Sequence, residues 1–194
     1  RFRTYFINRF ADVMNTAYKF NRLSSIDNSM FNQTVVEMQQ EYYRWGNGNL
    51  PQQMNSFYNN HLIFQSQLEQ RTHEVRNHIQ NNFSLPNQVD LTLDVYPTGS
   101  GKIHISTIDV DSFPWNGVYF NGIPVRIEAI ANPGFHFIHW GNNGLISDTL
   151  NIVFNDTLNT LSTNFTAYFT ANVGVDEQTT ENYFSIYPNP VKDE

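Results

Sequence analysis

The sequence predicts an α+β fold, in which an N-terminal segment of about three helices precedes a small antiparallel β domain. Two observations carry this prediction. Apolar residues recur at helical spacing as far as about Phe83, and from Val89 they alternate with polar residues, as they do in strands with one buried face. About six such alternating runs follow without an intervening helix, which favours an antiparallel sheet.

The helical part is expected over residues 1–84. A first helical stripe consists of Phe2, Phe6, Phe10, Val13 and Ala17. A second stripe begins at Leu23, Ile26 and Met30. Glycines at 46 and 48 interrupt the pattern, and Pro51 is suited to the first turn of a third helix. The stripe of that helix is Met54, Phe57, Phe64, Leu68, Arg71, Val75 and Ile79.

The β module is expected over residues 85–171. Its first strand alternates from Val89 to Val95, residues 97–101 form a turn, and Ile103 with Ile105 begins a return strand. Later runs predict strands around residues 125–131, 135–137, 150–154 and 165–169. The connection at residues 85–87 is short, so we expect the helices and the sheet to pack together.

Composition excludes several classes of function. The 18 acidic residues outnumber the 11 basic ones and no stretch gathers lysine and arginine, so nucleic acid is not an expected partner. No apolar run approaches the length of a transmembrane helix. The absence of cysteine excludes disulfides, thiolate zinc sites and cysteine nucleophiles. No catalytic residue, metal site or cofactor is predicted.

An aromatic cluster in the middle of the β module is the best candidate for a ligand platform. Its members are Phe113, Pro114, Trp115, Tyr119 and Phe120, and Asn116 and Asn121 could add hydrogen bonds at its edges. Flat aromatic faces of this kind can stack on sugar rings. The favoured alternative is that these aromatics are buried over one end of the sheet or at its junction with the helices, because an exposed patch of this size is unusual.

His136 and His139 form an H-x2-H pattern. On a regular strand, residues three apart point to opposite faces. A zinc site also needs three or four convergent ligands, so two ordinary strand histidines are expected.

The helical part resembles the C-terminal helices of spore-coat CotH kinase-like proteins. The resemblance lies in FINRFADVMNTAYKFNRLSSIDNS at 6–29, in YRWG at 43–46 and in the segment 64–75. It implies helices that complete an atypical protein-kinase fold whose ATP-binding and metal-binding residues lie upstream of them. The chain has no glycine-rich phosphate loop followed by a helix and no lysine placed to hold phosphates, so it is not expected to act as an enzyme.

The sheet part resembles divergent relatives of the internalin B-repeat. The matching segments are LTLDVYPTGSGKIHIS at 91–106, GIPVRIEAIANPGFHFIHWG at 122–141 and FTAYF at 165–169. This resemblance implies adhesion, spacing and display.

The C-terminal segment 172–194 is expected to be a linker followed by the start of a sorting domain. YFSIYPNPVKDE at 183–194 resembles the opening of the C-terminal sorting domain of Bacteroidetes type IX secretion cargo, with its turn at Tyr187, Pro188, Asn189 and Pro190. The resemblance implies the type IX secretion machinery as a partner and a secreted or outer-surface location. Thr149 and Thr157 lie in D-T-L triplets that resemble Bacteroidetes O-glycosylation sites.

Two function classes follow from the sequence. In the first, the chain is the noncatalytic C-terminal part of a secreted or surface-attached protein, with helices as support, a β module as spacer or adhesion unit that contacts a surface protein or glycan, and an export tail. In the second, the β module is a carbohydrate-binding domain for extracellular glycans. Whether Trp115 and Tyr119 are exposed or buried distinguishes the two.

Overall fold

The computed structural model describes residues 2–142, 145–147, 151–154 and 162–172. Three helices come first: α1 (Phe2–Asn15), α2 (Phe20–Trp45) and α3 (Leu50–Asn82). The strands that follow are listed in chain order: β1 (Gln88–Tyr96), β2 (Gly101–Ile105), β3 (Ile108–Val110), β4 (Trp115–Phe120), β5 (Val125–Ala131), β6 (Phe135–Asn142), β7 (Leu145–Ser147), β8 (Asn151–Phe154) and β9 (Ser162–Ala171). The predicted α+β class, with helices before a β domain, is confirmed.

The strands form two sheets, where the sequence predicted one. One sheet has the order β4-β1-β9-β6-β7 and the other has the order β3-β2-β5-β8. The expected return strand β2 therefore pairs with β3 and β5, and the turn at 97–101 carries the chain across to the opposite sheet. A second difference is that β1 and β9 are parallel, which joins strands far apart in the sequence at the centre of the larger sheet.

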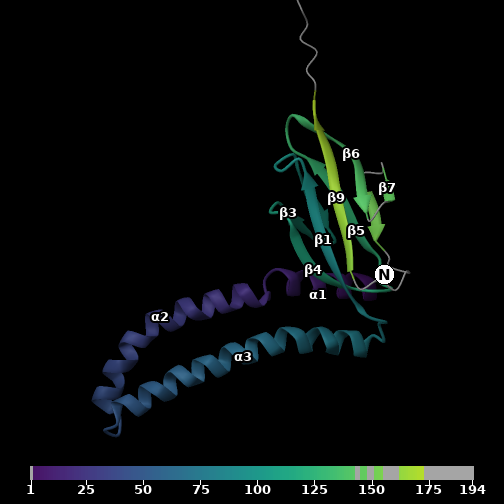
Figure 1. Cartoon of the computed structure of the whole chain (residues 1–194). Coiled ribbons are helices and arrows are strands. Elements are labelled where there is room, and N and C mark those ends of the chain that lie inside the picture. Colours follow the sequence, from purple (N-terminus) through teal and green to yellow (C-terminus); the bar gives the residue numbers. More distant parts are fainter. Residues whose placement is uncertain (1, 143–144, 148–150, 155–161, 173–194) are drawn as a thin grey trace, which may run out of the picture.

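The two sheets pack face to face, and we call them together the sandwich. Helices α2 and α3 form an antiparallel hairpin that extends away from the sandwich, and we call this hairpin the arm (Figure 1). Asn49 starts α3 by accepting a hydrogen bond from the backbone N–H of Gln52 at 3.2 Å, and Pro51 occupies its first turn. The seam between the helices includes Phe31 stacked on Phe57, with ring centroids 5.1 Å apart. The predicted stripe of α3 is partly wrong, because Phe64 and Arg71 face outward.

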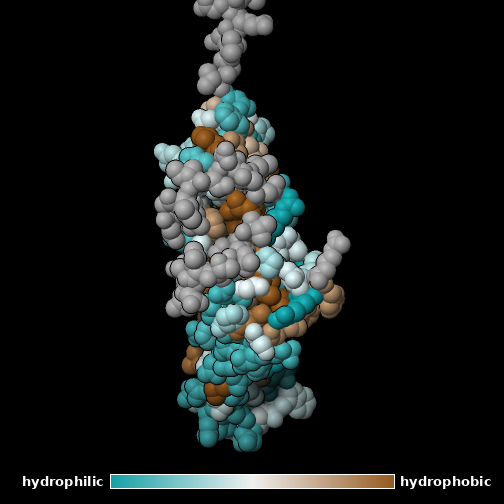
Figure 2. Space-filling view, turned by 90° about the vertical axis from the view of Figure 1, so that its right-hand side faces the viewer, coloured by the Kyte–Doolittle hydropathy of each residue, from teal (hydrophilic) through white to brown (hydrophobic). Residues whose placement is uncertain are grey.

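Neither helix of the arm contains a buried residue. Among the described residues the large apolar side chains that are exposed on the arm include Met30, Val36, Tyr43, Trp45, Leu62 and Ile63. Figure 2 looks at the molecule from the end opposite the arm and shows hydrophobic groups among hydrophilic ones on the sandwich and on the helices below it. The fold of the chain therefore leaves much of the apolar surface of the arm without cover.

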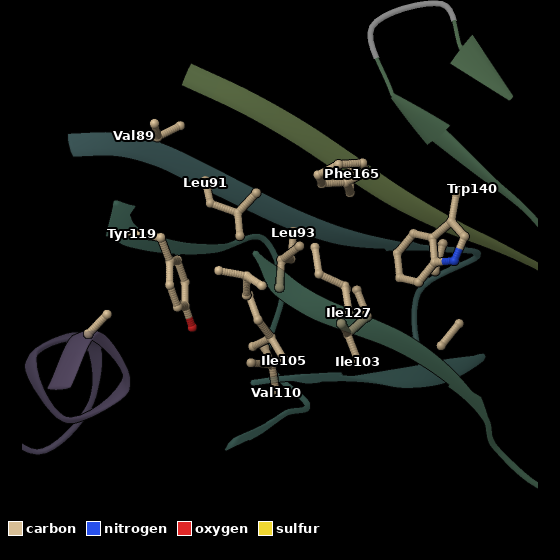
Figure 3. Packing of buried hydrophobic residues seen from close by; sticks show 14 of the residues in the cluster. Val89, Leu91, Leu93, Ile103, Ile105, Val110, Tyr119, Ile127, Trp140 and Phe165 are labelled. Carbon is tan, nitrogen blue, oxygen red and sulfur yellow. The ribbon is translucent and has the colours of Figure 1, made fainter. Parts of the chain in front are cut away.

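The main core lies between the two sheets (Figure 3). Leu91 and Leu93 from β1 face Ile103 and Ile105 from β2, and all four are at most 1% exposed. Trp140 closes the core from β6. Helix α1 belongs to the same core through Ile7 and Ala11, so one end of the sandwich is closed by a helix.

A β-bulge at Ile138 keeps the aromatic side of β6 facing inward. Phe137 pairs with Phe169 and His139 pairs with Tyr168, which leaves Ile138 as the extra residue. Because the bulge adds one residue, Phe137 and Trp140 both contact the core although they are three positions apart.

This geometry predicts the effects of two single deletions. Deletion of Ile138 removes only the bulge and leaves Phe137 and Trp140 facing inward, so we expect a folded protein that loses less than about 2 kcal/mol of unfolding free energy. Deletion of Thr92 from the regular strand β1 puts the residues before and after it out of phase, so that Leu91 and Leu93 can no longer both face inward, and we expect cooperative unfolding to disappear. Urea unfolding followed by near-UV circular dichroism measures both, and equal damage from the two deletions would contradict the assigned bulge.

Candidate functional site

The junction between α1 and the sandwich is built around the carboxylate of Asp12. This side chain is completely buried. Its Oδ2 accepts hydrogen bonds from the Ser106 hydroxyl at 2.8 Å, the Thr107 hydroxyl at 2.7 Å and the Thr107 backbone N–H at 3.1 Å. Its Oδ1 accepts from the Tyr119 hydroxyl at 2.7 Å. One carboxylate thus fixes α1 to the β2–β3 turn and to β4.

The local backbone aims these donors at the carboxylate. Ser106 has a positive φ of 54°, which turns the chain sharply between β2 and β3. Burial of the Tyr119 phenol, and then the neighbouring Asp12 carboxylate, raise the pKa of Tyr119 well above its ordinary value. Tyr119 therefore stays a proton donor to Asp12 over the physiological pH range.

Asn15, one turn further along α1, covers the edge of the larger sheet. Its side-chain amide donates to the carbonyl of Val118 at 3.0 Å and accepts from the N–H of Val118 at 2.9 Å. These are the two backbone groups that another strand would pair with, and β4 is an edge strand. Gly117 leaves room for this contact, since a Cβ there would lie 2.9 Å from the Asn15 amide nitrogen.

Arg76 joins α3 to the same junction. Its guanidinium donates to the carbonyl of Met14 at 3.1 Å and to Oδ1 of Asn15 at 3.0 Å. Both acceptors lie in the last turn of α1, where a cation is favourable for the helix dipole. Burial lowers the pKa of Arg76, and the charge of Asp90 partly opposes this effect.

A cleft of about 500 Å³ opens beside this junction, between the helices and the β4 edge. Its lining includes Lys19, Arg76, Asp90 and Asn116. Lys19 donates to the carbonyl of Asn116 at 3.3 Å, which ties the start of α2 to β4. These groups offer hydrogen bonds and mixed charge to a small polar ligand. Among the described residues no three histidine or carboxylate side chains gather as metal ligands.

The possible aromatic platform is wrong for Tyr119, Phe120 and Asn121, and the favoured alternative, burial of the aromatics, is confirmed for Tyr119 and Phe120. Tyr119 and Phe120 are at most 2% exposed, so neither can stack on a ligand at the surface. Asn121 is also buried, and its amide donates to Oδ1 of Asn87 at 3.0 Å. Trp115 is half-buried against the core and Asn116 is exposed beside the cleft. The aromatic cluster lies largely on strand β4, whose pairing with β1 turns Tyr119 inward.

The prediction for the two histidines is wrong in its geometry. His136 pairs with Thr170 and His139 pairs with Tyr168, and those two partners are two residues apart on β9. Both histidines therefore lie on the outer face of the larger sheet, because the bulge at Ile138 restores the alternation. His136 Nδ1 is 2.8 Å from Oδ1 of Asn172, and the His139 ring stacks on Tyr168.

The residues that build the junction were missed in the sequence. Asp12, Asn15 and Arg76 are polar residues within or beside apolar helical stripes, and a buried charge needs partners. That placement is a signal that could have marked them. The predicted glycosylation residues Thr149 and Thr157 and the predicted sorting turn at 187–190 lie outside the described residues.

Comparison of the chain with protein-family models, with curated proteins and with solved structures finds no match. Within the described residues, no helix combines the length and the apolar character that crossing a bilayer requires. The chemistry of the junction and of the sheet faces is therefore what bears on function.

The junction predicts a graded loss of stability. Asp12→Ala leaves the buried Tyr119 hydroxyl and the half-buried donors of Ser106 and Thr107 without their acceptor, so we expect it to lower the unfolding free energy by at least about 3 kcal/mol. Ser106→Ala removes one donor and should cost about 1 kcal/mol. Asp111→Ala, at an exposed aspartate, is the matched control and should change stability by less than about 0.5 kcal/mol.

Urea unfolding with unchanged m values measures all three variants. A loss in Asp12→Ala no larger than that in Asp111→Ala would contradict the role of the carboxylate.

Proposed function

We propose that the chain is a noncatalytic support and adhesion module of a secreted or surface-attached protein. The observation that carries this proposal is the junction, where a buried carboxylate, an edge-covering amide and a half-buried guanidinium join α1, α3 and the sandwich. Such a junction suits a module that holds its two parts at a fixed angle.

The arm fits the support role. Its outward side chains include apolar residues such as Met30, Leu62 and Ile63, and residues 45–68 contain no lysine, arginine, aspartate or glutamate. Exposed apolar side chains on a helix surface that carries few charges are suited to packing against another protein surface. Because the helices resemble the C-terminal helices of CotH-like proteins, we propose that the arm packs against a kinase-like domain of the same polypeptide.

The sandwich fits the spacer and adhesion role. Its core is closed at one end by α1, and the outward side chains of β1, β9 and β6 are available on the face of the larger sheet. The sheet segments resemble B-repeats, and the C-terminal tail resembles type IX sorting domains. From these two resemblances we propose that the chain is displayed outside the cell and that the type IX machinery is its partner in export.

The support role predicts a fixed distance between the arm and the sandwich. The chain has no native cysteine, so spin labels can be placed at Lys102→Cys on β2 and Asn55→Cys on α3, both at exposed positions. Pulsed electron paramagnetic resonance should give a distance distribution between Lys102→Cys and Asn55→Cys that is as narrow as the distribution for a control pair. The control pair is Lys102→Cys with Asn164→Cys, whose two exposed positions both lie on the sandwich. Adding Arg76→Ala should broaden the arm distance alone, because it removes two hydrogen bonds between α3 and the last turn of α1.

A broad arm distance in the otherwise unchanged chain would contradict a support role, since the arm would then swing freely on its connections.

The noncatalytic role predicts that calorimetric titration with ATP and Mg²⁺ gives no saturable heat. Phosphoryl transfer needs a phosphate cradle and metal-binding carboxylates, and the sequence supplies neither pattern. Saturable binding with turnover that a single substitution in this chain abolishes would overturn this part of the proposal.

A further inference from the structure

The outer face of the larger sheet carries a row of three rings on three adjacent strands. Tyr96 on β1 is in register with Tyr168 on β9, and Tyr168 is in register with His139 on β6. The Tyr96 and Tyr168 ring centroids are 5.7 Å apart, and those of Tyr168 and His139 are 4.6 Å apart. The row crosses the strands at right angles, and with strands about 4.8 Å apart it is about 10 Å wide.

The row is accessible. Tyr96 is 63% exposed and the other two rings are half-buried. Gly141, two residues beyond His139 on the same face, lets the Tyr168 ring lean over β6, since a Cβ at Gly141 would lie 2.9 Å from Cε2 of Tyr168.

Polar side chains flank the rings on both sides. One neighbouring row consists of Asp94 and Thr166, which are paired across β1 and β9 and lie two residues before the tyrosines. The other neighbouring row pairs Thr170 with His136 across β9 and β6. A ligand that covers the rings would thus meet a carboxylate, hydroxyls and an imidazole at its edges.

The charge on this face selects among ligands. Near the rings, the outward positions of β1, β9 and β6 carry Asp94 and no lysine or arginine. Asp90 lies towards the other end of β1, beside Arg76 and Lys19. Acidic glycans, phosphates and nucleic acid would meet repulsion without a compensating cation. The Tyr168 and His139 rings stack on each other, so their shared faces are covered, and the exposed Tyr96 ring supplies the main face that the C–H groups of a neutral sugar can contact. The hydroxyls of the sugar form hydrogen bonds with the polar side chains beside the rings.

We propose that the Tyr96, Tyr168 and His139 row is a binding site for neutral oligosaccharides. This inference rests on the adhesion role proposed above and names a ligand class for it. The site differs from the aromatic segment that the sequence suggested, because β4 turns that segment into the core. The bulge at Ile138 contributes directly, because it brings His139 to the outer face in register with Tyr168.

The test is a titration of the full chain with neutral hexasaccharides of glucose, mannose and xylose, followed by calorimetry and by backbone chemical shifts. We expect at least one to bind below about 5 mM and to shift resonances of β1, β9 and β6. Tyr168→Ala and Tyr96→Ala should each weaken binding by about tenfold or more, and Tyr168→Phe, which keeps the ring, should stay within about threefold. Tyr43→Ala, at an exposed aromatic of the arm, is the matched control and should leave binding unchanged.

Three outcomes would overturn the site. They are no binding by any of the neutral probes, binding that both Tyr168→Ala and Tyr96→Ala leave intact, and binding only of oligogalacturonate or only of choline as the anionic and cationic comparison probes. Tyr96 is largely exposed, so its alanine variant still tests the site if Tyr168→Ala does not fold. If none of the saccharides binds but the distance distribution between arm and sandwich is narrow, the saccharide site is refuted and the proposed support role is retained.

Discussion

A buried carboxylate has to be surrounded by donors, and the arrangement of this protein depends on how that requirement is met at Asp12. The donors come from the turn between β2 and β3 and from Tyr119 on β4, so both sheets contribute to binding one residue of α1. With α1 held in this way, Ile7 and Ala11 can close the end of the core. The position of the last turn of α1 in turn decides where Arg76, and with it α3, can be held.

The polar character of the junction gives orientation more than stability. Well-packed apolar contacts would often stabilise such an interface equally well, whereas hydrogen bonds are satisfied in one geometry only. The arm has a comparable polar layer, in which Asp27 contacts His61 at 2.7 Å and also accepts from Gln65. Our hypothesis is that this layer fixes the register of α2 against α3, as single polar residues do in coiled coils.

The two faces of the larger sheet have taken different roles because its strands alternate. The inward face uses Leu91, Leu93 and Phe165 for the core, and the outward face is left for Tyr96, Tyr168 and polar residues. On β6 the bulge at Ile138 lets Phe137 and Trp140, which are three residues apart, both face inward, while His136 and His139 both face outward. The same fold therefore supplies a stable core and an accessible aromatic row without one competing with the other.

The sequence by itself determined the three helices, the boundary near residue 84, the inward residues of β1 and the existence of strands β2 and β5, because these depend on local periodicity and on glycine and proline signals. Only the tertiary structure decided the pairing of β1 with β9, the transfer of β2 to a second sheet and the burial of Tyr119, because strand pairing joins segments that no local pattern connects. The bulge at Ile138 was likewise decided only by the tertiary structure. Alternation alone puts His136 and His139 on opposite faces, and only the register against β9 shows that both face outward.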